Sequence, residues 1–190
     1  MATRAATAHS RYSQVAIVLH WTIALLIIGN IIGGLVLAND LLDGQAKASV
    51  MTLHQSAGLT VLLLSVARLA WRLTNPPPSL PEHMTAAEHL LAKSTHWLFY
   101  GLMFVLPLSG WAMSSTSPKY PILYLWLFEV PKLPVEMSRA NGGFYNEIHE
   151  YAAYLAIATL ALHITGALKH HYFDRDNVLA RMLPGVTPKA

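Results

Sequence analysis

The sequence predicts an all-α integral membrane protein, a four-helix bundle whose N- and C-termini lie in the cytoplasm. Of its 190 residues, 54% are hydrophobic and only 12% are charged, against roughly 25% charged residues in a soluble domain. The stretches 12–39, 48–67, 94–118 and 151–168 contain no Asp, Glu, Lys or Arg. Each of them meets or approaches the roughly 20 apolar residues that a helix needs to cross a bilayer.

The first two spans are expected at 15–38 and 50–72. The apolar stretch of the first is longer than the roughly 7–15 residues of a signal-peptide core, which favours an uncleaved span. The second span ends before the run from Asn75 to Pro78, because consecutive prolines cannot continue a helix. The short connection between these spans suits an antiparallel helical pair.

The third span is expected at 93–115, within a helix that starts before the membrane. Thr85 and Glu88 have the spacing of a capping box, which marks a helix N-terminus. Pro107 is expected to kink this helix, because proline leaves the carbonyl four residues earlier without its hydrogen bond.

The fourth span is expected at 147–171, after the longest connection in the chain. That connection, 117–146, contains the apolar patch from Ile122 to Phe128. The patch is too short to cross a membrane, and we expect it to lie along the interface at the outer end of the bundle.

The distribution of basic residues predicts the orientation. The termini and the second connection contain nine lysines and arginines, namely Arg4, Arg11, Arg68, Arg72, Lys93, Lys169, Arg175, Arg181 and Lys189. The other two connections contain four, namely Lys47, Lys119, Lys132 and Arg139. By the positive-inside rule, this asymmetry puts both termini in the cytoplasm.

Any redox metal in this chain is expected to be held by histidine. The absence of cysteine excludes disulfides, thiolate-bound iron–sulfur clusters and covalently attached c-type haem. Each charge-free stretch contains one histidine, His20, His54, His96 or His163, and His149 stands at the outer start of helix four. Ionisable residues at membrane depth are costly and usually functional, although any one of these could simply hydrogen-bond a neighbouring helix.

Helix position sorts four of these histidines into two pairs. His149 and His163 are 14 residues apart, which puts them on one helix face and about 21 Å apart along the axis. His20 enters its span from the inside, near the depth of His163, and His54 enters from the outside, near the depth of His149. Two facing imidazoles can bind a haem iron from both sides. A structural zinc ion is bound by four ligands, so two histidines alone do not suit it.

Small residues near the pairs would let a flat macrocycle pass between helices. They are Gly29, Gly33, Gly34, Ala57, Gly58 and Gly166. Gly29 and Gly33 fit a Gly-x-x-x-Gly helix contact equally well. Histidine spacing and small residues together predict two b-type haems.

Several motifs of this chain occur together in one known family. They are His20-Trp21, His54 followed by Gly58, Arg68 with Arg72, His149-Glu150, His163, the run from Lys169 to Phe173, Asp176-Asn177 and Met182-Leu183-Pro184. With these motifs, which extend over about 11–185, the chain resembles the bacterial cytochrome b561 family of four-helix, di-haem membrane proteins, and most closely its superoxide oxidases. The resemblance implies a single membrane cytochrome b domain over 1–190, multi-pass in the bacterial inner membrane.

The resemblance also implies the ligands. The family's histidines that match His20 and His163 hold a haem near the cytoplasmic face, and those that match His54 and His149 hold the outer haem. His96 remains a rival ligand of the inner haem, with a contact to propionate or quinone and a plain interhelical histidine as the alternatives.

Other polar residues at the inner boundary have two interpretations each. Arg68 and Arg72 share a helix face and are suited to bind haem propionates. Such side chains can equally extend to lipid headgroups, the interpretation that we favour for Arg72. His170 or His171 could donate a hydrogen bond to a quinone, or both could belong to an interfacial polar cluster.

Two hypotheses about function follow. The resemblance implies an enzyme, a superoxide:ubiquinone oxidoreductase, in which superoxide or another one-electron donor delivers electrons on the outer side and ubiquinone accepts them near the inner side. The alternative is a cytochrome b subunit that serves a separate dehydrogenase or hydrogenase, docking through 117–146.

Some functions are excluded or unsupported. Iron held by two histidines has no open position, which excludes oxygenase and peroxidase chemistry. Acidic residues outnumber basic ones on the outer side, so net charge there does not predict attraction of the superoxide anion. The expected partners are the lipid bilayer, a quinone and a one-electron donor, with no nucleic acid among them.

Overall fold

The computed structural model describes residues 11–81, 83–118 and 121–186. Its four long helices are α1 (Gln14–Ala38), α2 (Gly44–Thr74), α3 (Ala86–Ser115) and α4 (Arg139–Lys169). A π-helical turn, η1 (His170–Asp174), continues α4. All four helices are long and apolar enough to cross a membrane, which confirms the predicted four-helix membrane bundle.

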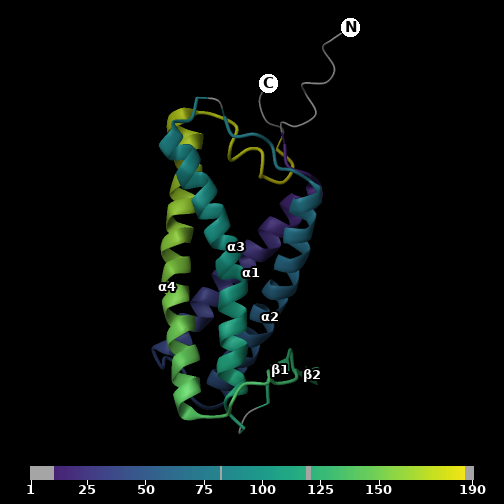
Figure 1. Cartoon of the computed structure of the whole chain (residues 1–190), viewed down its shortest axis with the longest axis vertical. Helices are drawn as coiled ribbons and strands as arrows, with labels where there is room; N and C mark the ends of the chain where they lie inside the picture. The colour runs from purple at the N-terminus through teal and green to yellow at the C-terminus, as the bar shows by residue number, and fades with distance from the viewer. Residues whose placement is uncertain (1–10, 82, 119–120, 187–190) are drawn as a thin grey trace.

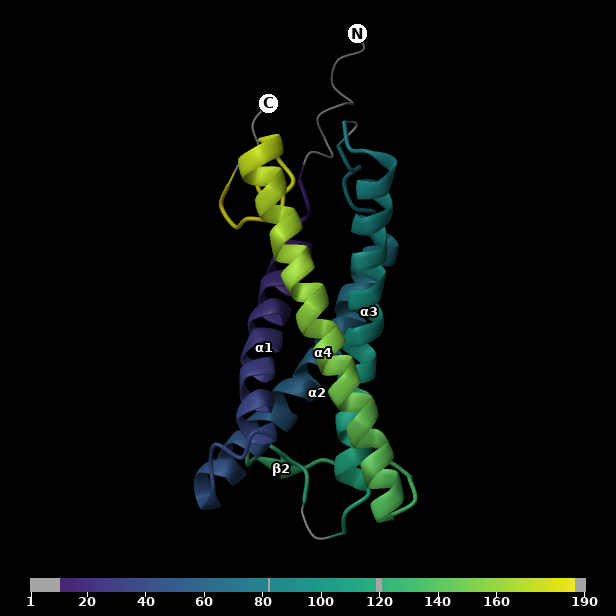
Figure 2. The ribbon, with the colours of Figure 1, turned by 90° about the vertical axis from the view of Figure 1, so that its left-hand side faces the viewer.

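The helices run up and down beside one another (Figures 1 and 2). The start of α1 and the end of α4 lie at one end, here called the terminal end, and a small hairpin lies at the other, the hairpin end. Helix α1 packs on α2, α2 on α3 and α3 on α4. Within the described ranges, α4 packs closely on neither α1 nor α2. The cytoplasmic location of the termini stays a prediction.

Side-chain caps mark the start of three of the four long helices, α1, α3 and α4. The Ser13 hydroxyl accepts a hydrogen bond from the Ala16 amide at the start of α1. The predicted capping box of Thr85 and Glu88 is present at the start of α3. Ser138 caps α4 in the same way as Ser13 caps α1. Because Ser138 caps α4, that helix begins well before its apolar stretch. Helix α2 also begins early, at Gly44, although the Asp43 side chain makes no cap hydrogen bond.

The apolar patch expected at the interface forms the hairpin. Strands β1 (Leu123–Tyr124) and β2 (Phe128–Glu129) pair antiparallel. The neighbouring Ile122 is buried at 2% exposure. The Leu125 amide donates to the Ser56 hydroxyl over 2.8 Å, so the hairpin is bonded to α2 and covers that end of the bundle.

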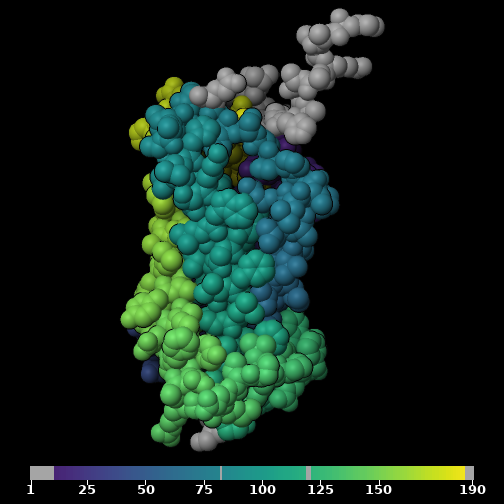
Figure 3. Space-filling model, viewed as in Figure 1, coloured from purple at the N-terminus to yellow at the C-terminus, as the bar shows by residue number. Residues whose placement is uncertain are grey.

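An apolar layer fills the middle of the bundle. Ile23, Val61, Tyr100 and Met103 form a buried cluster contributed by three helices. Ile23 follows His20 by one helical turn, and Val61 lies two turns from His54, so this layer lies between the two histidine pairs. The surface of the bundle is hollowed near the terminal end in Figure 3. Yellow atoms of the chain's C-terminal part are visible inside this hollow.

Candidate functional site

The structure brings the four histidines together in the two pairs expected from their depth. The ring centroids of His54 on α2 and His149 on α4 are 6.1 Å apart. Those of His20 on α1 and His163 on α4 are also 6.1 Å apart. About 6 Å is expected for two imidazoles that bind one metal from opposite sides, since each metal–nitrogen bond is about 2 Å and each nitrogen lies about 1 Å from its ring centre. Haem ligation by these pairs stays a prediction.

Both pairs join helices that do not pack on each other. His163 faces α1 and His149 faces α2, and within the described ranges α4 packs closely on neither helix. A planar macrocycle needs such a separation, because it must fit between the helices that carry its two ligands. The donor set and the helix spacing therefore fit a haem at each pair.

Backbone carbonyls orient the rings at the hairpin end. Nδ1 of His54 donates to the Asn30 carbonyl over 3.1 Å, and Nδ1 of His149 donates to the Leu106 carbonyl over 2.9 Å. A carbonyl oxygen can only accept, so Nδ1 carries the proton in both rings. This leaves the Nε2 lone pair of each ring available to a metal, the usual arrangement of metal-bound histidines.

A cavity of about 470 Å³ adjoins this pair. Its volume lies within the roughly 300–1,000 Å³ of cofactor and ligand pockets. His54 and His149 are among its lining residues, which come from all four helices and include Ile122 next to the hairpin. The lining is mostly apolar, as suits a hydrophobic macrocycle.

Two glycines make room for the histidine rings at the hairpin end. A Cβ placed on Gly34 would lie 3.1 Å from Cε1 of His54, and one on Gly110 would lie 3.1 Å from Cε1 of His149. Either methyl group would push on the ring. Gly29 and Gly166, also expected near the pairs, have nothing within 4 Å of such a Cβ in the described structure.

The Gly110→Ala substitution is expected to loosen the haem of the hairpin end. The added methyl group displaces the His149 ring, and overpacking of this kind costs about 1–3 kcal/mol. Haem content per chain and the temperature of haem release measure the effect. Gly101→Ala on the same helix is the control, because a Cβ there meets nothing within 4 Å. Equal haem retention in the two variants would contradict the conclusion that Gly110 makes room for the His149 ring.

Three histidines, not two, meet near the terminal end. The ring of His163 lies 6.1 Å from that of His20, 5.6 Å from that of His96 and 5.5 Å from that of Phe99. Distance alone therefore does not choose between His20 and His96. Helix packing does distinguish them, since α3, which carries His96, packs closely on α4, whereas α1 does not.

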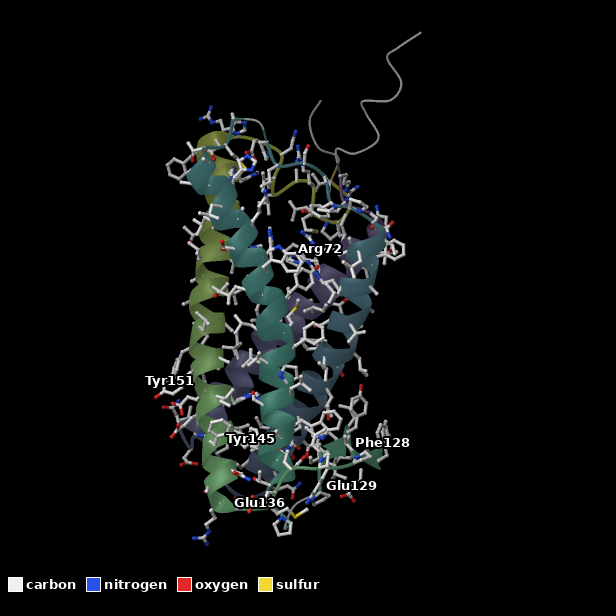
Figure 4. The ribbon with its side chains drawn as sticks, viewed as in Figure 1. Arg72, Phe128, Glu129, Glu136, Tyr145 and Tyr151 are labelled. Carbon is white, nitrogen blue, oxygen red and sulfur yellow. The ribbon has the colours of Figure 1, made fainter. Side chains whose placement is uncertain are left out.

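Two arginines and a tyrosine lie beside this group. Arg68 is close enough to His20, His96 and His163 to interact electrostatically with each of them. The Arg72 guanidinium carbon lies 5.6 Å from the centre of the Tyr100 ring on α3, and Figure 4 draws Arg72 between the helices. Arg72 therefore faces the bundle, and the lipid-facing interpretation favoured for it was wrong.

Tyr12, just before α1, lines a small pocket together with both arginines. Burial raises the pKa of Tyr12 above its ordinary value. Its hydroxyl therefore remains neutral and able to donate a hydrogen bond to an anionic group held by the arginines.

Motif residues from opposite ends of the chain meet at the terminal end. The Trp21 indole donates to the Met182 carbonyl over 2.8 Å, and Arg11 donates to the Leu183 carbonyl over 2.7 Å. These bonds hold the C-terminal segment against the start of α1, next to His20. His170 is buried and bonded to Asp176, whereas His171 is exposed and contacts the Tyr172 ring.

Sequence reasoning missed Gly110, Ser109 and the carbonyls that orient the rings. The hydroxyl oxygen of Ser109 lies 3.1 Å from Nδ1 of His149. The one available signal was Gly110 itself, a small residue in the outer half of the third span, near the depth expected for His149 on the fourth helix. Every residue has a carbonyl, so the sequence does not indicate which one accepts a histidine proton.

Comparisons with known proteins point to one family. A family model described as prokaryotic cytochrome b561 matches residues 11–185. The chain is 30% identical over 174 residues to cytochrome b561 homolog 2 of Escherichia coli (strain K12), with 91% of each chain covered. It is 29% identical over 187 residues to the probable superoxide oxidase CybB of Yersinia pestis, covering 93% of this chain and 97% of that one.

A third relative is cytochrome b561 homolog 1 of Escherichia coli (strain K12), 30% identical over 179 residues, with 92% of this chain and 98% of that one covered. The family match extends over nearly the whole chain, and these relatives are covered over nearly their full lengths. The chain belongs to the prokaryotic cytochrome b561 family, a family of b-type haem cytochromes.

Proposed function

We propose that this protein is a di-haem cytochrome of the bacterial inner membrane that oxidises superoxide at the hairpin end and reduces ubiquinone at the terminal end. The observation that carries the proposal is the presence of two facing histidine pairs near opposite ends of one bundle. His54 and His149 would hold one haem b, and His20 and His163 the other. Bound haem supplies one-electron transfer through its edge, since two imidazoles leave no open iron position.

Residues around each histidine pair would orient the iron ligands and bind the haem propionates. At the hairpin end, the Asn30 and Leu106 carbonyls keep the Nε2 lone pairs of both histidines available. At the terminal end, Arg68 and Arg72 would bind the propionates through charge-assisted hydrogen bonds. His20 is preferred to His96 as the second ligand because, within the described residues, its helix α1 does not pack closely on α4, whereas α3, which carries His96, does.

The proposed reaction is balanced. Two superoxide anions each lose one electron and become dioxygen, and ubiquinone gains two electrons and two protons to become ubiquinol. Likeness to the probable superoxide oxidase supports superoxide as the donor. Net charge does not, since the exposed Glu129 and Glu136 lie at the hairpin end (Figure 4). Superoxide would therefore arrive without long-range attraction.

The test is a superoxide assay with purified, haem-loaded protein. A steady superoxide flux should fall only while quinone is present, and one quinol should form for every two superoxide anions consumed. The His54→Ala variant should show neither effect, because the electron entry site is lost. An unchanged flux with both haems bound would refute the donor assignment. A dehydrogenase that co-purifies in stoichiometric amount would instead favour the electron-transfer subunit.

A further inference from the structure

Three potential metal ligands from two distant segments converge at the terminal end, outside both histidine pairs. His83 belongs to the connection between α2 and α3, His170 begins η1, and Asp176 follows η1. One ligand atom of each lies within 4.8 Å of those of the other two. We propose that these residues bind a zinc-type divalent cation, which ties the α2–α3 connection to the C-terminal segment.

The distances suit such an ion with small adjustments. Oδ2 of Asp176 lies 2.7 Å from Nδ1 of His170 and 3.3 Å from Nε2 of His83. Around tetrahedral zinc, with bonds of about 2.0–2.2 Å, neighbouring ligand atoms are about 3.3 Å apart. The His83 contact already has this value. The His170 contact needs to lengthen by less than 1 Å when zinc takes the place of a shared proton.

Two of the three ligands are held in position. Oδ1 of Asp176 accepts the Val178 amide over 2.8 Å, which aims Oδ2 at the histidines. The Asp176 amide donates to the His170 carbonyl over 3.1 Å, and the intervening Arg175 has a left-handed φ of 55°. The side chains of His170 and Asp176 are only 11% and 10% exposed, so the site is largely shielded from water.

The third ligand provides the opening and the freedom to adjust. The His83 side chain is 56% exposed, so an ion can enter from solvent and the ring can turn toward it. His83 belongs to the connection between α2 and α3, whereas His170 and Asp176 belong to the C-terminal segment. A hydrogen bond from Arg181 to the Ser79 carbonyl already joins these two segments. A bound ion would add a stronger link between the same two segments.

The charge and the donor atoms favour zinc over magnesium or calcium. Two imidazoles and a carboxylate form a set that borderline divalent metals prefer, whereas magnesium and calcium prefer oxygen atoms alone. Asp174 lies 3.1 Å from Nδ1 of His170 and would add negative charge or a fourth ligand. Lys169 bonds Asp174 over 2.7 Å, which offsets part of the repulsion between the two carboxylates.

The experiment measures zinc binding to the purified, haem-loaded protein after removal of any affinity tag and treatment with a chelator. Equilibrium dialysis against zinc chloride, with metal analysis, should give one tightly bound zinc per chain. His83→Ala should weaken binding by more than the roughly 10–100-fold that loss of a metal's supporting residue costs. His171→Ala is the matched control, because this exposed histidine lies next to the site but outside it.

A second readout separates binding at this site from binding elsewhere. Zinc should raise the thermal midpoint of the wild type and of His171→Ala, but not that of His83→Ala or Asp176→Asn. Unaltered haem spectra verify that the variants are folded. The absence of saturable zinc, or wild-type affinity in His83→Ala, would reduce the cluster to a set of hydrogen bonds. Neither readout involves superoxide or quinone, so the outcome is independent of the proposed activity.

Discussion

Replacement of His54 by alanine is expected to remove the haem of the hairpin end and to leave the other haem in place. The variant lacks one of the two proposed iron ligands that line the cavity of about 470 Å³, and α2 offers no second histidine. The apolar layer around Val61 and Met103 separates this site from the other pair, so the loss should stay local. Haem per chain, measured as the pyridine complex, should fall from two to one.

An optical redox titration supplies the second measurement for this prediction. His149→Ala should lose the same centre as His54→Ala, since the two side chains face each other. His171→Ala should keep both haems and serves as the control. Loss of both haems from a folded variant, or of neither, would refute the pairing.

His20→Ala is expected to abolish the haem of the terminal end, whereas His96→Ala retains it. Both rings lie near His163, and that of His96 is the closer at 5.6 Å. The reason for choosing His20 is helix packing. In the described part of the chain α1 and α4 do not pack closely on each other, as a macrocycle between its two ligands requires, whereas α3 packs on α4 along part of its length.

Haem content and the low-spin spectrum of each variant decide between the two ligands. We expect one haem per chain in His20→Ala and two in His96→Ala, with at most a shifted potential in the latter. The reverse result would assign the iron to His96 and would require α3 and α4 to separate on haem binding. His163→Ala should lose this haem in either case.

Much of the architecture was predictable from local sequence features. Four charge-free stretches indicated four apolar helices, because a charge at membrane depth is costly. The capping box at Thr85 and Glu88 depends on residues three positions apart, and it is present. The histidine pairing was also within reach, because helical rise converts sequence spacing into depth.

Other features depend on contacts between distant residues and had no local signal. Arg72 was expected to face lipid, but it lies over Tyr100, because helix rotation is decided by packing rather than by side-chain length. Gly110 was overlooked, since only the tertiary structure brings it against His149. The bond between Trp21 and Met182 joins two motifs whose proximity no spacing predicts.

The sequence by itself determined the membrane-spanning helices, the restriction of redox ligands to histidine, and the depth of each histidine. These properties follow from composition and from distance along one helix, both of which are local. Only the tertiary structure decided which carbonyls orient the rings, which glycines make room for them and which helices leave room for a macrocycle. Those properties depend on how helices rotate and pack, and packing is a sum of many weak contacts between residues far apart in the chain.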